Sequence, residues 1–306
     1  MHKKALSNQI KEAAANRGFI ACGIAKAEYL EKYGEAYDKW LDKGYQADMH
    51  YMENYREKRK DPRKLVDGAQ SVISVLYNYY PEQELPEEGN YKLSRYAYGK
   101  DYHFVVKDYL KALLADIETL AGPQNARIFI DTAPVMDRAW AELAGIGWIG
   151  KNSMLINRKY GSYVFVGEII TDLPLAYDTP MNNLCGGCTL CLQACPTEAI
   201  IKDGVIDSNK CISYWTIENK TDQMPETLRD KFEDNIFGCD ICQEVCPWNR
   251  FSKPHREPQF HPHPGLLAMD KQAWQNLTQE QYRTYFKKSA VKRAKYSGLK
   301  RNINFI

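Results

Sequence analysis

Hydrophobic and polar residues in the N-terminal part of the chain recur with the two periods that distinguish helices from strands. Apolar positions fall every three or four residues over 6–16 and again over 29–43, which predicts two amphipathic helices. Gly44, after the second, is typical of a helix end. Residues 19–25 and the apolar run over 70–79 predict strands, and the second of these is interior by composition. The chain therefore begins as an α/β structure.

The middle of the chain continues this alternation of helix and strand. Residues 101–120 have helical periodicity, and 126–131 predict a further strand. Pro134 is suited to the first turn of a helix, which is predicted to end at Gly145.

Two β-rich runs, over 153–156 and 162–171, flank a polar turn that ends in Gly161, and this arrangement predicts a β-hairpin. Because helical crossovers occur together with a hairpin, we expect an α/β (α+β) fold around a mixed sheet. The predicted domains are an α/β domain over 1–175, a cysteine-rich domain over 176–252 and a basic helical tail over 253–306.

Composition and charge do not indicate a binding partner, but they do indicate the cellular compartment. The net charge of the 306 residues is only +2, yet Lys and Arg are concentrated towards the C-terminus. No apolar run follows the N-terminal Met-His-Lys-Lys or is long enough to span a bilayer, so the sequence predicts a soluble, cytoplasmic protein. Nine cysteines in that compartment argue against disulfides and favour metal or cluster ligation.

Eight of the nine cysteines follow a spacing that is characteristic of iron–sulfur proteins. The first four read Cys-x2-Cys-x2-Cys-x3-Cys-Pro, as in bacterial ferredoxins, and a shortened version follows later in the chain. Each two-residue gap lets a short loop wrap one corner of a 4Fe–4S cubane, while the cysteine before proline ligates the other cluster. This crossing rule predicts that Cys185, Cys188, Cys191 and Cys246 hold the first cluster, and that Cys195, Cys211, Cys239 and Cys242 hold the second.

The second set contains a departure from the ferredoxin repeat, because Cys211 lies in a separate loop and replaces a missing cysteine of the run. Structural zinc is the alternative for Cys-x2-Cys pairs, but closely spaced cysteines followed by Cys-Pro, twice over, suit two tetrahedral zinc sites poorly. The ninth cysteine, Cys22, is expected to be a small buried apolar residue and not a redox thiol.

Two further motifs carry less weight. Residues 145–150 match the dinucleotide pattern G-x-G-x-x-G, but a predicted helix precedes them and a strand follows, the reverse of the order that phosphate binding requires. Asp101-Tyr102-His103 resembles the start of a cobalt-ligating histidine loop. Val106 stands where that loop needs glycine, so an ordinary helical face is predicted.

Taken together, local motifs along nearly the whole chain resemble the epoxyqueuosine reductases. The motifs are Glu57-Lys58-Arg59 before Pro62, residues 98–103, Asp131-Thr132-Ala133-Pro134 with Arg138, residues 144–152, and the cysteine pattern that includes Cys211. The resemblance implies a cobalamin-binding first domain related to reductive dehalogenases, with base-off cobalamin, and a ferredoxin-like second domain with two 4Fe–4S clusters. The implied reaction is two-electron reduction of epoxyqueuosine to queuosine at the wobble position of tRNA, through cob(I)alamin fed by the clusters.

The resemblance also implies roles for individual residues. Asp131 matches the proton donor of the family. On the sequence alone, a capping or turn role is favoured for Asp131, because the nearby helix start stabilises a carboxylate. The positions implied to line cobalamin are Arg59, Ser94, Asp131, Lys151, Asn152, Ser213 and Asp240.

The basic residues near the C-terminus have two interpretations. By themselves they predict a solvated basic helix, whereas with a tRNA substrate they become a phosphate-contacting surface with aromatic rings among the charges. The predicted tRNA contacts are Lys287, Lys288, Lys292, Arg293, Lys295 and Arg301. The implied partners are tRNAs with a GUN anticodon (Asp, Asn, His and Tyr) and a low-potential electron donor of unknown identity, with the protein expected to be a monomer without membrane contact.

Two other functions stay open at this point: a cobalamin-dependent reductive dehalogenase acting on a small molecule, and a ferredoxin-type electron relay. The missing export signal and the basic C-terminus count against the first. The large α/β domain counts against the second, because a relay would leave it without a function.

Overall fold

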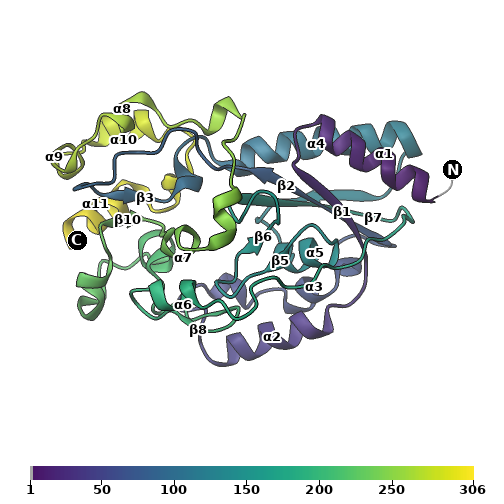
Figure 1. Cartoon of the computed structure of the whole chain (residues 1–306), viewed down its shortest axis with the longest axis horizontal. Coiled ribbons are helices and arrows are strands. Elements are labelled where there is room, and N and C mark those ends of the chain that lie inside the picture. The colour runs from purple at the N-terminus through teal and green to yellow at the C-terminus, as the bar shows by residue number, and fades with distance from the viewer. Residues whose placement is uncertain (1–2) are drawn as a thin grey trace.

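The computed structural model describes residues 3–306, in which a layered α/β domain, a cysteine-rich segment and a C-terminal group of helices follow one another (Figure 1). No helix in this range is long and apolar enough to cross a bilayer. The α-helices are α1 (Lys3–Asn16), α2 (Glu31–Asp42), α3 (Arg56–Lys60), α4 (Tyr102–Ala121), α5 (Asp137–Leu143), α6 (Leu190–Ala194), α7 (Ile241–Glu244), α8 (Pro264–Leu267), α9 (Lys271–Gln275), α10 (Gln279–Tyr285) and α11 (Lys295–Phe305). The strands are β1 (Ala21–Lys26), β2 (Ser71–Asn78), β3 (Lys92–Leu93), β4 (Ala126–Phe129), β5 (Trp148–Ile149), β6 (Leu155–Ile156), β7 (Val164–Thr171), β8 (Ile200–Lys202), β9 (Val205–Ile206) and β10 (Asn235–Phe237).

The central sheet has the strand order β1-β2-β7-β4, and every neighbouring pair in it is antiparallel. The α plus β class is therefore confirmed, but the expected mixture of parallel and antiparallel strands is absent from this sheet. Among the described strands the parallel pair is β3 with β10, which form a separate small sheet. As the apolar run over 70–79 predicted, β2 is buried along its whole length.

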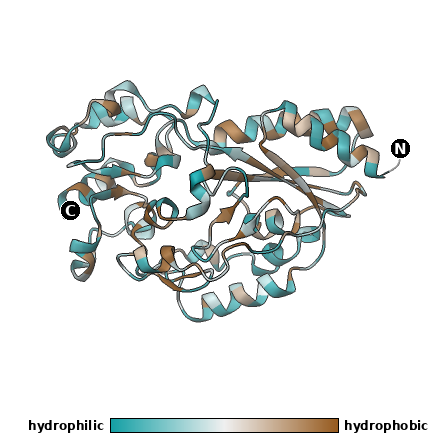
Figure 2. Cartoon of the chain, viewed as in Figure 1, coloured by the Kyte–Doolittle hydropathy of each residue, from teal (hydrophilic) through white to brown (hydrophobic). Residues whose placement is uncertain are grey.

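The two faces of the sheet are covered by different helices. Alternate residues point to opposite faces of a strand, so Ile73 and Ile169 join the core under α1 and α4, whereas Val72 and Ile170 join the core under α5. Figure 1 shows α1 and α4 on one side of the sheet and α2, α3 and α5 on the other. Figure 2 shows the matching pattern, with hydrophobic residues along the sheet and a largely hydrophilic α2.

The boundaries of most predicted helices agree with the structure within a few residues. Gly44 and Gly145 follow helix ends with φ of 65° and 70°, the left-handed conformation that glycine adopts without strain. Gly145 thus ends α5 and does not open a dinucleotide-binding turn, as predicted. Helix α5 begins at Asp137 and not at Pro134, because the intervening residues form an irregular turn.

The predicted hairpin between 153–156 and 162–171 is wrong. Strand β6 pairs with β5, while β7 crosses the central sheet between β2 and β4. The turn before Gly161 is present, but it closes through a single bridge between Asn157 and Gly161. The local turn residues therefore predicted correctly that the chain reverses here, but they did not predict which strands pair.

The C-terminal residues 253–306, expected as a separate tail, pack into a second hydrophobic core. Buried side chains of α8 to α11, among them Trp274 and Phe286, share this core with residues of the 85–98 segment and of β10. The cysteine-rich segment lies between this second core and the α/β domain (Figure 1).

Candidate functional site

The structure places Asp131 on an exposed turn just beyond the end of β4. Its backbone has a φ of 48°, an uncommon conformation for a non-glycine residue, and its side chain is 64% exposed. The Tyr102 hydroxyl donates to Asp131 Oδ2 at 2.5 Å, and His103 Nε2 lies 3.9 Å from the same oxygen. An accessible carboxyl group therefore lies beside a hydroxyl donor and an imidazole ring.

The first turn of α4 positions both neighbours of Asp131. Asp101 caps this helix by accepting from the His103 backbone N–H at 2.9 Å, and the same oxygen lies 2.7 Å from His103 Nδ1. With Nδ1 facing Asp101, His103 presents Nε2 to Asp131. The Tyr102 ring stacks on Phe165 of β7 with centroids 4.2 Å apart. Burial raises the pKa of Tyr102 and the charge of Asp131 raises it further, so its hydroxyl stays a donor.

Residues 101–103 were expected to form an ordinary helical face, but in the structure Tyr102 and His103 lie next to the Asp131 carboxyl group. The sequence signal that could have found them is Asp101 before a helix, because a cap residue fixes where the following side chains point. Arg138, on α5, also belongs to this region. It donates to the backbone carbonyl of Ser153, and burial lowers its pKa against the opposing charges of Asp131 and Asp137.

Two tyrosines connect the Asp131 turn to the rest of the molecule. The Tyr96 ring lies 6.3 Å from the Tyr102 ring and 6.2 Å from the Phe237 ring of β10. Burial raises the pKa of Tyr96, and the charges of Glu218, Asp240 and Asp131 add to that rise. The Arg293 guanidinium lies 5.7 Å from the Tyr51 ring centroid. Neither tyrosine was predicted as a site residue.

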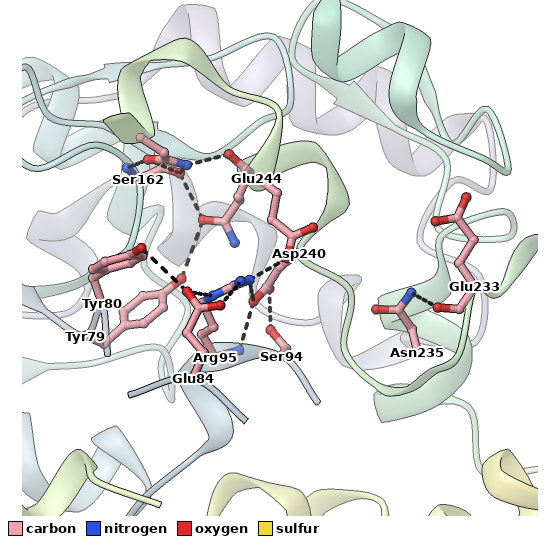
Figure 3. A network of polar contacts seen from close by, with 12 residues as sticks. Tyr79, Tyr80, Glu84, Ser94, Arg95, Ser162, Glu233, Asn235, Asp240 and Glu244 are labelled. Carbon is pink, nitrogen blue, oxygen red and sulfur yellow. Dashed lines mark hydrogen bonds and ion pairs between the residues drawn. The ribbon is translucent and has the colours of Figure 1, made fainter. Parts of the chain in front are cut away.

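Ser94 and Asp240, both predicted to line cobalamin, are buried and bonded to each other (Figure 3). Ser94 Oγ donates to Asp240 Oδ1 at 2.5 Å, and the Arg95 backbone N–H donates to Oδ2 at 2.8 Å. Arg95 Nη1 lies 3.5 Å from Oδ2, and its guanidinium also contacts Glu84 and Glu244. Burial raises the pKa of Asp240, and the donors from Ser94 and Arg95 oppose that rise.

The cysteines predicted to bind the first cluster lie near one another. Burial raises the pKa of Cys191, and the thiols of Cys246, Cys185 and Cys188 raise it further. Burial also raises the pKa of Cys246, and its charged neighbours Cys185 and Cys188 raise it further. The chain therefore returns through α7 to bring Cys246 to the first cysteine loop, although some 55 residues separate them in the sequence.

The cysteines predicted for the second cluster form another group. Burial raises the pKa of Cys242, and its charged neighbours include Cys211 and Cys195. Burial also raises the pKa of Cys239, whose neighbours include Cys242 and Cys211. Cys211, which departs from the ferredoxin repeat, thus lies with this group.

The surroundings of these sulfurs suit ligands that carry negative charge. The Ala199 backbone N–H donates to Cys195 Sγ at 3.3 Å. Hydrogen bonds from the backbone of Tyr214 and Ser213 lower the pKa of Cys211 against the larger effect of burial. Such donors stabilise cluster-bound thiolates. Within residues 3–306, no three His, Cys, Asp or Glu side chains converge as a single metal ion requires. A cubane does not require that convergence, because each thiolate binds a different iron atom.

The remaining residues predicted to line cobalamin are arranged around these groups. Asn152 is buried and donates to the Cys242 backbone carbonyl at 3.0 Å. Lys151 pairs with Asp203 at 3.3 Å. Arg59 donates to the Tyr51 backbone carbonyl at 3.1 Å, which links it to the segment under Arg293.

The predicted tRNA contacts divide into two groups. Lys287, Lys288, Lys292 and Lys295 are exposed, and no ion pair of theirs occurs within the part of the chain that the structure describes. The Lys288 backbone carbonyl accepts from the Asp101 N–H at 2.8 Å, so this basic segment passes beside the start of α4. A shallow cavity of about 270 Å³ lies further along; its lining residues are Gln279, Tyr282, Arg283, Lys292, Lys295 and Tyr296.

The other two predicted contacts have partners inside the protein. Arg293 pairs with Glu218, with Nη2 and Oε2 2.7 Å apart. The half-buried guanidinium of Arg301 donates to the Trp215 backbone carbonyl at 2.9 Å and to Asn219 Oδ1 at 2.8 Å. Arg301 therefore fastens α11 to the segment after Cys211, and little of its hydrogen-bonding capacity is left for another molecule.

Comparison with known proteins identifies both halves of this arrangement. A family model described as "Epoxyqueuosine reductase QueG, DUF1730" matches residues 59–132, and one described as "4Fe-4S double cluster binding domain" matches residues 184–249. An epoxyqueuosine reductase of Cellulophaga algicola is 52% identical over 304 residues, which are 99% of this chain and 99% of that protein. One from Synechocystis is 44% identical over 92% of this chain and 98% of its own length.

Solved structures agree with these matches. An epoxyqueuosine reductase bound to an epoxyqueuosine-modified tRNA stem loop superposes with a TM-score of 0.89 at 29% identity, covering 98% of this chain and 80% of that one. The Bacillus subtilis enzyme, seen with an aspartate-bearing catalytic loop swung out of its active site, gives 0.88 at 28% identity with the same coverage. A catabolic reductive dehalogenase shares the fold, with a TM-score of 0.52 at 18% identity over 99% of this chain and 38% of that one.

Proposed function

The chain belongs to the epoxyqueuosine reductase family, and we propose that it reduces epoxyqueuosine to queuosine at the wobble position of tRNA. The observation that carries this proposal is the 52% identity to a curated epoxyqueuosine reductase over 99% of both chains. The reaction removes the epoxide oxygen as water and leaves a carbon–carbon double bond, so it consumes two electrons and two protons. A low-potential electron source and a proton donor must both reach the substrate.

The electron source is a pair of 4Fe–4S clusters on the two cysteine groups described above. Supporting this assignment are the match to a double-cluster domain over 184–249 and the proximity of Cys246 to the first cysteine loop. Clusters of this type reach the low potentials that the reaction needs. The reductant that loads them is an external low-potential carrier.

Bound cobalamin would supply the electrons to the epoxide. Arg59 and Ser213 are suited to contact it through polar groups, with Lys151 beside them. Ser94, Asn152 and Asp240 use their polar atoms inside the protein, so they would form the wall of its site. The fold shared with a reductive dehalogenase supports a domain of this type.

Asp131 is the proposed proton donor to the epoxide oxygen. Its support is the contact with the Tyr102 hydroxyl at 2.5 Å and the exposed carboxyl group, which a substrate can approach. After Asp131 has given up its proton, the Tyr102 hydroxyl stabilises the resulting carboxylate, and His103 lies close enough to take part in recharging it.

The tRNA is proposed to lie across the basic segment from Lys287 to Lys295. Lys292 and Lys295, with Arg283, line a cavity that also presents tyrosine rings, a combination that suits a phosphate backbone and adjacent bases. The wobble base would leave the anticodon loop to reach Asp131, as recognition of single-stranded loops generally requires. Substrates with GUN anticodons, a monomeric state and a cytoplasmic location complete the proposal.

The test is an anaerobic conversion assay. Iron-loaded protein is incubated with cobalamin, a strong reductant and tRNA that contains epoxyqueuosine, and the nucleosides are then analysed by mass spectrometry. The expected result is a product lighter by one oxygen atom. Arg283→Gln with Lys292→Gln should weaken tRNA binding and reduce its dependence on salt, whereas Lys39→Gln, an exposed lysine of α2, serves as the matched control. Intact epoxyqueuosine after incubation with fully loaded protein would refute the proposal.

A further inference from the structure

Two neighbouring carboxyl groups, one fully buried and one partly buried, lie near the Asp131 turn. Glu168 sits in the middle of β7 and is completely buried. Because alternate residues of a strand point to opposite faces, Glu168 points to the same face of the sheet as Ile170, towards α5. In the strand register it is paired with Ser74 of β2 on one side and with Phe129 of β4 on the other. Asp137, the first residue of α5, is its charged neighbour there, and the charge of Asp137 adds to burial in raising the pKa of Glu168.

Within residues 3–306, both oxygens of Glu168 and Oδ1 of Asp137 have no hydrogen-bond partner. A carboxylate only accepts hydrogen bonds, so these oxygens can be satisfied within the pair only if one carboxyl group is protonated and donates to the other. Two ionised carboxylates in contact and without a cation would be strongly unfavourable in a protein interior.

The charged groups around the pair do not supply that cation. On α5 the charge of Arg138 lowers the pKa of Asp137 against the larger effect of burial, but the guanidinium itself donates to Ser153. The strands packed on α5 contribute no basic side chain at this level: β2, β5 and β6 contain none, and on β1 the charged residue is Lys26, exposed at the strand end and paired with Glu28. Asp131 is the other charge that acts on both carboxyl groups, and it raises the pKa of each in addition to the larger effect of burial.

We propose that Asp137 and Glu168 share one proton at neutral pH and pass it to Asp131 during turnover. This inference rests on the proposed function, which needs two protons for each epoxide. Asp131 gives its proton to the epoxide oxygen, and the shared proton then restores Asp131, which completes the departure of that oxygen as water. Solvent then returns one proton to Asp131 and one to the pair, so two electrons and two protons are consumed for one double bond and one water formed.

The pair can be detected without substrate by infrared spectroscopy, because a protonated carboxyl group has a C=O stretch that a carboxylate lacks. The iron-loaded wild-type protein should show a buried protonated carboxyl at pH 7, and Glu168→Gln should remove it, because the remaining Asp137 can then ionise. Glu142→Gln is the matched control: Glu142 lies on the same helix but accepts from the Tyr33 hydroxyl and the Ile149 N–H. Asp137→Asn makes the same test should Glu168→Gln fail to fold.

The role in turnover is tested by the pH dependence of single-turnover epoxide reduction. The wild type and Glu142→Gln should keep their rate to higher pH than Glu168→Gln or Asp137→Asn, because the variants lose the stored proton. Identical pH profiles, or an infrared spectrum that neither variant changes, would overturn the proposal. If the protein does not reduce epoxyqueuosine at all, the infrared signal still reports on the pair, so the two failures can be told apart.

Discussion

Replacing Arg95 by methionine should destabilise the protein far more than removing an exposed ion pair. Arg95 is only 8% exposed, and its guanidinium faces three carboxylates, of which Asp240 is 6% exposed while Glu84 and Glu244 keep 40% and 36% of their side-chain surface. Methionine retains most of the apolar volume and removes the charge, so the change isolates the electrostatic loss.

The magnitude follows from the burial of Asp240. Removing one partner of a buried ion pair costs about 3–5 kcal/mol, whereas Glu84 and Glu244 are hydrated and contribute little. Ser94 Oγ and the Arg95 N–H still donate to Asp240 in the variant, which places the loss near the lower limit, at about 3 kcal/mol. With a urea m-value of about 3 kcal/mol per M, the unfolding midpoint should fall by about 1 M.

The assay is anaerobic urea unfolding of the iron-loaded protein, followed by tryptophan fluorescence and by cluster absorbance. Arg17→Met removes the exposed pair with Asp116 and should leave the midpoint nearly unchanged. Adding Asp240→Asn to Arg95→Met should recover part of the loss, because the uncompensated buried charge is then gone. A midpoint for Arg95→Met that matches the Arg17 control would refute the reasoning.

Three further changes test other parts of the account. Asp131→Asn should keep both clusters and lower turnover by about 10²–10⁴-fold, while Asp108→Asn, on the exposed face of α4, should not change turnover; normal turnover in the first would mean that another group supplies the proton. Cys211→Ala should lose about half of the iron, whereas Cys22→Ala, which removes a partly buried thiol whose pKa burial raises to about 12, should lose none; full iron content in Cys211→Ala would assign the ligand elsewhere. Burial lowers the pKa of His255 to about 4, below the value of about 6.5 in an unfolded chain. The unfolded state therefore takes up the proton first, and the stability of the folded protein should fall as the pH drops from about 6.5 to 4. His255→Phe should flatten that fall in pH-dependent unfolding, and an unchanged slope would contradict this prediction.

What the sequence predicted well was local. The run over 70–79 and the periodic segment over 101–120 appear as β2 and α4 because each carries enough apolar residues of one period to determine its own conformation. The cysteine spacing was equally informative, since wrapping a cubane constrains neighbouring residues. It even indicated that Cys246 approaches the first cysteine loop, because the crossing rule is part of the motif.

What the sequence missed was set by contacts between distant segments. Strand β6 pairs with β5 and not with β7, and both β5 and β6 pack against α5. The contact between Tyr102 and Asp131 joins a helix start to a strand end 29 residues away, and no local pattern encodes it. From the sequence, Arg301 was predicted to be one of several exposed cations in a basic segment. In the structure it donates to carbonyl groups of Trp215 and Asn219, which lie more than 80 residues earlier in the chain.

The presence of two 4Fe–4S clusters is the claim on which the electron path depends. Protein purified with oxygen excluded throughout should contain about eight iron and eight acid-labile sulfide atoms per chain, and reduction should give the electron paramagnetic resonance signal of reduced 4Fe–4S clusters. A colourless protein that contains zinc or no metal under the same conditions would contradict the account.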